Sequence, residues 1–310
     1  MNNTDLARQA RRHNIRRYYK MESRITGHTR LFGLIGSPVG HSGSPAMYNY
    51  SFAHNGLDNA YLAFDIPLDK VEDAVAAIRT FNFGGFNITM PDKAEVCKYL
   101  DDISPAAKLI GACNTVVVGE DGKLTGHNTD GIGFVRNLHE HGVEVKGKKI
   151  VLLGAGGAAT AIAAQTSLDG AAKLSMFNIK DEFYAKGEAI IERLHEAVPG
   201  CESSITDLAD AEALKAAVAE CDILVNATKV GMKPLDDQTL IDPSMFRPDL
   251  VVADTVYNPK ETLMIQQAAE AGCAAAIGGI GMLLWQGAAA FKLFTGEDMP
   301  TQEVLENFFS

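Results

Sequence analysis

The segment that most constrains how this 310-residue chain can fold is the run from Ile150 to Ala159, Ile-Val-Leu-Leu-Gly-Ala-Gly-Gly-Ala-Ala. Apolar residues lead directly into a glycine-rich turn and a stretch of small residues, which predicts a strand, a tight turn and a helix. Gly154, Gly156 and Ala159 match the G-x-G-x-x-G/A dinucleotide fingerprint. The free N–H groups at the start of the helix would then face the phosphates of a dinucleotide.

A second predicted strand, residues 173–178, bears on the choice of nucleotide. Lys180 and Asp181 follow it, at the place where an acidic residue binds the ribose 2′-hydroxyl. Asp181 lies further from the glycine-rich turn than the usual ~20 residues, which a long first helix would accommodate. Lys180 could instead contact a 2′-phosphate, and Asp181 could also act as the N-cap of a helix beginning at Glu182.

Length and composition indicate a soluble protein of two domains. With 46% hydrophobic and 22% charged residues, the chain is ordinary for that class. A net charge of −11 argues against nucleic acid as the main partner. Residues 1–30 are an exception, because they carry eight Arg and Lys against two acidic residues. Such an arm is more often a frayed terminus or a contact with an acidic neighbouring subunit than a segment that binds polyanions.

The cysteines and the apolar segments predict a cytoplasmic protein. Five cysteines are scattered without Cys-x-x-Cys spacing, which suits reduced thiols and predicts no metal site. The first residues lack the apolar segment of a secretory signal. Residues 273–291 are uncharged and long enough to span a membrane, but their glycines and Gln286 favour a buried strand, a turn and a helix.

The order of predicted elements indicates an α/β protein. Strands and helices alternate through the first part, which favours a largely parallel sheet, and a β-hairpin follows at residues 111–130. The glycine-rich turn then opens a doubly wound domain, whose ligand loops would lie at the carboxyl ends of the strands. Its further helices and strands are predicted at residues 182–198, 203–206, 211–219, 222–226, 262–271 and 275–277.

Several polar residues of the first part stand near predicted helix starts. Ser44 before Pro45 is typical of an N-cap, and Ser42 beside it suits a carboxylate or hydroxyl ligand. Lys93 is expected in the first turn of a helix, where a cation opposes the macrodipole. Asp130 is expected at another helix start, where helix capping by Thr129 or Asp130 is the simplest explanation. An ionised carboxylate there could also hold a nearby lysine.

Seven motifs together make residues 30–305 resemble the shikimate dehydrogenase family, and most closely its quinate/shikimate dehydrogenase branch. The order and identity of the motifs carry this resemblance, because none of them is specific alone. They are Ser42-Gly-Ser-Pro-Ala-Met, Asn87-Ile-Thr-Met-Pro-Asp-Lys, Gly111-Ala-Cys-Asn-Thr, Asn128-Thr-Asp-Gly, Gly154-Ala-Gly-Gly-Ala, Val256-Tyr-Asn-Pro and Gly281-Met-Leu-Leu-Trp-Gln-Gly-Ala.

The resemblance implies an active site between a substrate domain and a Rossmann domain. Lys93 and Asp130 would be the catalytic pair. The substrate, shikimate or quinate, would contact Ser42, Ser44, Tyr61, Thr89, Asn114 and Gln286. Residues 29–130 would form the substrate domain, completed by helices from 281–310 that fold back onto it, and residues 131–280 the Rossmann domain. Residues 1–28, the basic arm, have no counterpart in a typical member.

The resemblance also implies a nicotinamide nucleotide, NAD in preference to NADP. Asp181 stands where NADP-specific members have a basic residue, although Lys180 leaves NADP possible. Lys229 replaces a common serine, a change associated with members that accept quinate. The expected cofactor-binding residues are Gly154, Ala155, Gly156, Gly157, Ala158, Asn178, Lys180, Asp181, Lys229, Thr255, Val256, Tyr257, Asn258 and Gly279.

Two other interpretations remain open at this level. One is another two-domain Rossmann dehydrogenase of the methylenetetrahydrofolate type, which also uses a lysine; the paired serines and Gln286 argue against it. The other is a catalytically silent, ligand-sensing relative whose basic arm binds nucleic acid; the presence of Lys93 and Asp130 argues against that. The oligomeric state expected is a monomer or a homodimer.

Overall fold

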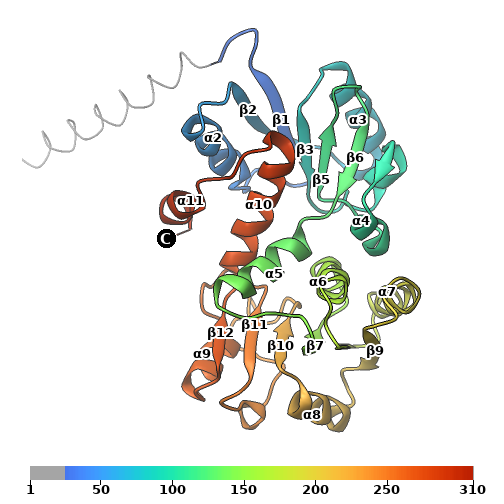
Figure 1. Ribbon diagram of the computed structural model, residues 1–310, viewed down its shortest axis with the longest axis vertical. Coiled ribbons are helices and arrows are strands. Elements are labelled where there is room, and N and C mark those ends of the chain that lie inside the picture. The colour runs from blue at the N-terminus through green and yellow to red at the C-terminus, as the bar shows by residue number, and fades with distance from the viewer. Residues whose placement is uncertain (1–24, 310) are drawn as a thin grey trace, which may run out of the picture.

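The computed structural model describes residues 25–309, so most of the basic arm lies outside the described residues. The chain forms two six-stranded sheets, one from each half of the sequence, with helices between and around them (Figure 1). This agrees with the predicted α/β class.

The first sheet has the strand order β2-β1-β3-β5-β6-β4. β1 pairs in parallel with β2 and β3, whereas β5 pairs antiparallel with β3 and β6 because a short turn joins β5 to β6. The sheet is therefore mixed rather than largely parallel. Its elements are β1 (Arg30–Gly36), α2 (Ser44–His54), β2 (Asn59–Asp65), η1 (Leu68–Lys70), α3 (Val71–Thr80), β3 (Gly85–Ile88), η2 (Glu95–Tyr99), β4 (Asp102–Ile103), α4 (Pro105–Ile110), β5 (Thr115–Val118) and β6 (Leu124–His127).

Helix α4 and strand β4 are missing from the sequence interpretation. The signals for α4 were present: Ser104 caps the helix by accepting from Ala107 N–H, Pro105 opens it, and Gly111 ends it in the left-handed conformation with φ 78°. Strand β4 has only two residues, and β6 is the strand with which it pairs. A strand that short carries no periodic pattern to predict it from.

The second sheet is parallel throughout, in the order β12-β11-β10-β7-β8-β9. The order reverses between β7 and β10, which is the switch point where doubly wound sheets bind their ligands. The elements are α5 (Asp130–Glu140), β7 (Lys149–Leu153), α6 (Gly157–Leu168), β8 (Lys173–Asn178), α7 (Tyr184–Ala197), β9 (Glu202–Asp207), α8 (Ala211–Glu220), β10 (Ile223–Asn226), η3 (Pro243–Met245), β11 (Val251–Asp254), α9 (Leu263–Glu270) and β12 (Ala275–Ile277).

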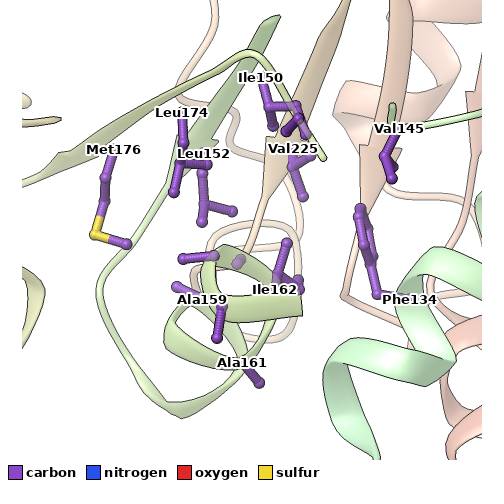
Figure 2. Close-up of a cluster of buried hydrophobic side chains, with 14 of the residues drawn as sticks. Phe134, Val145, Ile150, Leu152, Ala159, Ala161, Ile162, Leu174, Met176 and Val225 are labelled. Carbon is purple, nitrogen blue, oxygen red and sulfur yellow. The ribbon is translucent and has the colours of Figure 1, made fainter. Parts of the chain in front are cut away.

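Helix α6 packs on this sheet through small side chains. Figure 2 shows Ala159 and Ile162 of the helix facing the strand residues Ile150, Leu152 and Val225. All five are almost completely buried. Because alanines leave the helix close to the strands, its first turn is held against the glycine-rich turn that precedes it.

The last two helices, α10 (Ile280–Thr295) and α11 (Thr301–Phe308), return to the first sheet (Figure 1). Phe291 and Phe294 of α10 lie in one cluster with Phe32 and Phe52, at ring-centroid distances of 5.5 Å for Phe52–Phe291 and 5.3 Å for Phe32–Phe294. The apolar stretch 273–291 is thus divided between β12 and α10, as the sequence predicts. Within residues 25–309, no helix is long and apolar enough to cross a membrane.

Two glycines let α5 touch its neighbours at backbone distance. A Cβ on Gly133 would lie 2.5 Å from the backbone nitrogen of Gln286 in α10. A Cβ on Gly131 would clash with the carbonyl oxygen of Ala161 in α6. Helix α5 is therefore fitted closely both to the helix after the glycine-rich turn and to α10.

Candidate active site

A cavity of about 640 Å³ opens between the two sheets, and residues from both halves of the chain line it. The predicted site residues in its wall are Ser42, Ser44, Thr89, Lys93, Asn114, Asp130, Ala158, Thr255, Tyr257, Asn258, Gly279 and Gln286. The others lie outside this wall: Tyr61, Gly154, Ala155, Gly156, Gly157, Asn178, Lys180, Asp181, Lys229 and Val256.

Lys93 and Asp130 meet in this wall although 37 positions separate them in the chain. Lys93 Nζ donates to Asp130 Oδ2 at 2.6 Å, and the side chains keep only 23% and 16% of their exposure. The other carboxylate oxygen accepts from Asn114 Nδ2 at 2.8 Å. The carboxylate is thus held on both sides, while the ammonium can still reach the cavity.

Asn114 connects this pair to the β-hairpin and the start of α5. Its Oδ1 accepts from the backbone N–H of Thr129 at 2.8 Å, and its Nδ2 donates to Thr129 Oγ1 at 2.9 Å. Thr129 is the N-cap residue of α5, but its side chain makes no capping bond. The prediction that the side chain of Thr129 or Asp130 caps the helix is therefore wrong, because Asn114 donates to both side chains and Lys93 donates to Asp130.

The expected position of Lys93 in the first turn of a helix is also wrong. Residues 90–94 form turns, and the 3-10 helix η2 begins only at Glu95. The backbone carbonyl of Lys93 accepts from Cys113 N–H at 2.8 Å, which ties the turn to the segment before β5. The electrostatic environment of the ammonium is therefore set by Asp130 rather than by a helix dipole.

Ser42 and Thr89 line the cavity from the segments that follow β1 and β3, and Ser44 lines it as the first residue of α2. The N-cap of α2 is Gly43 and not the predicted Ser44, since the helix begins one residue earlier. Ser42 Oγ accepts from Ser44 N–H at 3.2 Å, and no side chain caps the helix otherwise. Both hydroxyls thus stand beside the positive end of a helix, which suits an anion.

The expected direct contact of Tyr61 with substrate does not fit its place. Tyr61 is fully buried, stacks on Tyr48 at 4.4 Å between ring centroids, and donates its hydroxyl to Asn87 Oδ1 at 2.8 Å. Asn87 and Tyr48 line the cavity instead. Tyr61 therefore supports Asn87 from one layer behind the wall, and burial raises its pKa so that its hydroxyl stays protonated.

Gln286 enters the cavity from α10, although it lies far in sequence from Lys93 and Asp130. Its Nε2 donates to Leu283 O at 3.0 Å. Gly133 of α5 has no room for a Cβ against the backbone of Met282 and Gln286, so α5 and α10 are in backbone contact at the residue that enters the cavity.

The glycine-rich turn meets the physical requirements for binding a dinucleotide phosphate. Gly154 has φ 109°, and a Cβ there would lie 2.8 Å from Ala227 O. Cβ atoms on Gly156 and Gly157 would instead meet nothing, so the surface over the start of α6 is open. No side chain caps α6, which leaves its first N–H groups to a ligand. The residues present fit the pyrophosphate of a nicotinamide nucleotide.

In the segment after β8, the structure contradicts the prediction that Asp181 is a helix N-cap. The N-cap of α7 is Phe183, so Asp181 does not cap that helix. Asp181 Oδ1 instead accepts from Phe183 N–H at 2.9 Å and from Asn178 Nδ2 at 2.8 Å. Lys180 is exposed, with its Nζ 6.0 Å from the Tyr184 ring.

One buried carboxylate forms hydrogen bonds to residues at the ends of both β10 and β11. Asp254 accepts from Asn226 Nδ2 and from Val256 N–H, both at 2.9 Å, and burial raises its pKa. This network holds Val256 inside and turns the following residues of the loop toward the cavity. A Cβ on Gly279 would meet the carbonyls of this loop, so only glycine fits opposite it.

Several wall residues were missed by the sequence interpretation: His41, Met47, Tyr48, Asn87, Lys260, Phe308 and Phe309. Asn87 and His41 belong to or adjoin quoted motifs, so a signal was present. Tyr48 and Met47 were hidden by their apolar surroundings in α2. Phe308 and Phe309 come from the end of α11, and only the return of that helix brings them to the cavity.

The fold and the site define a two-domain α/β oxidoreductase-type architecture, with a lysine–aspartate pair between a mixed sheet and a Rossmann sheet. Comparison with known proteins agrees. Residues 34–116 match the shikimate dehydrogenase substrate binding domain, and residues 279–306 match the shikimate 5′-dehydrogenase C-terminal domain. The chain belongs to the shikimate dehydrogenase family.

Individual relatives cover almost the whole chain. A shikimate dehydrogenase (NADP(+)) of Streptococcus uberis is 52% identical over 94% of this chain and 99% of its own length. A quinate/shikimate dehydrogenase of Escherichia coli is 46% identical over 90% and 96%. The crystal structure of shikimate 5-dehydrogenase from Listeria monocytogenes in complex with shikimate and NAD has a TM-score of 0.90 and 48% identity, covering 92% of this chain and 98% of that one. Membership of this family removes the methylenetetrahydrofolate-type alternative.

Proposed function

We propose that this protein catalyses the reversible oxidation of shikimate to 3-dehydroshikimate, and of quinate to 3-dehydroquinate, with a nicotinamide nucleotide. The observation that carries the proposal is the 2.6 Å pair of Lys93 and Asp130 in the cavity between the two sheets. The relatives named above support it, since their names state the same chemistry.

In this mechanism the protein manages the proton. A bound nicotinamide supplies the hydride acceptor when the substrate is oxidised. Lys93 takes the proton of the reacting hydroxyl as general base and returns it in the reverse direction. Asp130 orients Lys93, and Asn114 in turn fixes the carboxylate by donating to its second oxygen.

Substrate binding follows from the polar wall of the cavity. Ser42 and Ser44 bind the substrate carboxylate, aided by the positive end of α2. Thr89, Asn114 and Gln286 contact the ring hydroxyls, and Tyr61 contributes by orienting Asn87. Residues 29–130 with 281–310 make up the substrate-binding part and residues 131–280 the nucleotide-binding part.

For the nucleotide, we favour NAD over NADP. Asp181 carries a negative charge where a 2′-phosphate would lie and can accept a hydrogen bond from a free ribose hydroxyl. Lys180 beside it is exposed and allows some use of NADP. Lys229, which replaces a common serine, favours acceptance of quinate. A monomer or homodimer in the cytoplasm remains a prediction from the sequence.

Steady-state kinetics with both acids and both nucleotides test the proposal. We expect NAD reduction at 340 nm with shikimate and with quinate, and a lower KM for NAD than for NADP. A protein that binds shikimate but reduces neither nucleotide would favour the silent, ligand-sensing alternative. Loss of DNA retention on removing residues 1–28 would then support that alternative further.

A further inference from the structure

Two cysteines lie directly behind Lys93. Cys97 belongs to η2 and Cys113 to the segment before β5, and their sulfur atoms are 3.5 Å apart. Cys97 Sγ also lies 3.5 Å from the carbonyl oxygen of Lys93, and the Cys113 N–H donates to the same oxygen at 2.8 Å. Both cysteines therefore contact the backbone of the residue that holds the proposed general base.

The pair differs in access and in reactivity. Cys97 is half-buried and is the more exposed of the two, whereas Cys113 is fully buried. Their shared hydrogen bond lowers the pKa of Cys97 to about 7, and the same hydrogen bond, together with burial, raises the pKa of Cys113. Burial raises the pKa of the three other cysteines, Cys201, Cys221 and Cys273. Cys97 is therefore the thiol that reacts first, since the thiolate is the nucleophile.

We propose that Cys97 and Cys113 form an oxidisable dithiol whose disulfide switches off turnover by displacing Lys93. With a hydroperoxide as oxidant, the Cys97 thiolate attacks one peroxide oxygen, the O–O bond breaks and a sulfenic acid forms. The sulfur of Cys113 then attacks the Cys97 sulfur, an S–S bond replaces the S–O bond, and water leaves with the proton of Cys113. Two thiols lose two electrons and two protons, and hydrogen peroxide becomes two molecules of water.

The cross-link would change the geometry at the reacting lysine. A disulfide is about 2.05 Å long, so the two sulfurs must approach by roughly 1.5 Å. The part of that movement that the backbone takes up draws η2 toward the segment before β5, and both contact the carbonyl of Lys93. A displacement of about 1 Å in an active site costs on the order of 10² in rate. The effect on activity rests on the proposed role of Lys93, but the cross-link itself does not.

The sequence offers a direct assay for the cross-link. Tryptic cleavage after Lys93, Lys98, Lys108 and Lys123 places Cys97 in peptide 94–98 and Cys113 in peptide 109–123. We expect full-length protein treated with hydrogen peroxide and digested without reductant to yield these peptides joined, with two hydrogens fewer than their sum. Shikimate oxidation should fall about 10²-fold as the joined peptide accumulates, and dithiothreitol should restore it.

Two variants separate this switch from general oxidative damage. Cys97→Ser should keep its activity in peroxide, and Cys113→Ala serves the same purpose if the serine variant folds poorly. Cys273→Ser changes the other half-buried cysteine and should remain as sensitive as the wild type.

Three results would overturn the proposal: absence of the joined peptide, full cross-linking with unchanged activity, or equal inactivation of the Cys97→Ser variant. Reduced protein that fails to oxidise shikimate would instead count against the proposed function, and the joined peptide would still test the dithiol.

Discussion

Replacing Lys93 by methionine should abolish most of the activity while leaving the fold intact. Methionine keeps the aliphatic stem but removes the ammonium that donates to Asp130 at 2.6 Å. A positioned general base contributes typically 10²–10⁴ in rate, so kcat should fall by that factor. In transition-state free energy this is about 2.7–5.4 kcal/mol. Because the lost interaction acts in the transition state, kcat/KM should fall in parallel.

The effect on stability should be smaller and separately measurable. With 23% and 16% of their side-chain surface exposed, Lys93 and Asp130 lie between an exposed ion pair and a buried one. Exposed pairs contribute at most about 1 kcal/mol, and breaking a buried pair costs ~3–5 kcal/mol. Asn114 still donates to Asp130 in the variant, so we expect the free energy of unfolding to fall by roughly 1–3 kcal/mol. A domain of ordinary stability, about 5–15 kcal/mol, tolerates this loss.

The assay is NAD reduction at saturating shikimate, with Tm measured on the same samples. Lys98→Met is the matched control, because Lys98 lies five residues after Lys93 and makes an exposed ion pair with Glu95. Asp130→Asn should also lower kcat, and the double variant should be no slower than the single lysine variant, as for residues that act as a unit. A Lys93→Met enzyme with kcat within threefold of the wild type would refute the assigned role.

Three further substitutions test other parts of the site. Asp181→Ala should raise KM for NAD about tenfold, the effect of one lost hydrogen bond to a charged group, and narrow its advantage over NADP; an unchanged preference would discredit Asp181 as the selector. Tyr61→Phe should raise KM for shikimate severalfold at nearly constant kcat, because Asn87 loses its donor; unchanged KM would contradict this indirect role. Gly133→Ala should lower the free energy of unfolding by about 1–3 kcal/mol through overpacking against Gln286, and a raised Tm in a melting experiment would contradict that packing.

Much of the fold follows from the sequence because its elements carry strong local signals. Buried parallel strands such as Ile150–Leu153 appear in the sequence as apolar runs. The turn after this strand needs a glycine, because Gly154 has φ 109°. The boundaries of helices and strands are predicted less well where the same residues are compatible with two local structures. The chain near Lys93 places Pro91 in a turn followed by a 3-10 helix, whereas the same residues also suit a helix start.

The site is harder to predict because its contacts are made between distant segments. From spacing alone, Thr129 or Asp130 is predicted to cap the helix, because a local sequence pattern can indicate only hydrogen bonds between residues that are close in the chain. Asn114, directly before β5, donates to those side chains instead, at 2.9 Å to Thr129 Oγ1 and 2.8 Å to Asp130 Oδ1. The resemblance to a family, and not periodicity, paired Lys93 with Asp130.

One helix explains why these distant contacts form together. Asp130 is the first residue of α5, Gly131 brings that helix against α6 behind the glycine-rich turn, and Gly133 brings it against α10 beside Gln286. The Asp130 carboxylate, the glycine-rich turn and the Gln286 amide are thus related through backbone contacts of a single element. Neighbours in space favour glycine at both positions, which is a requirement that no local sequence pattern expresses.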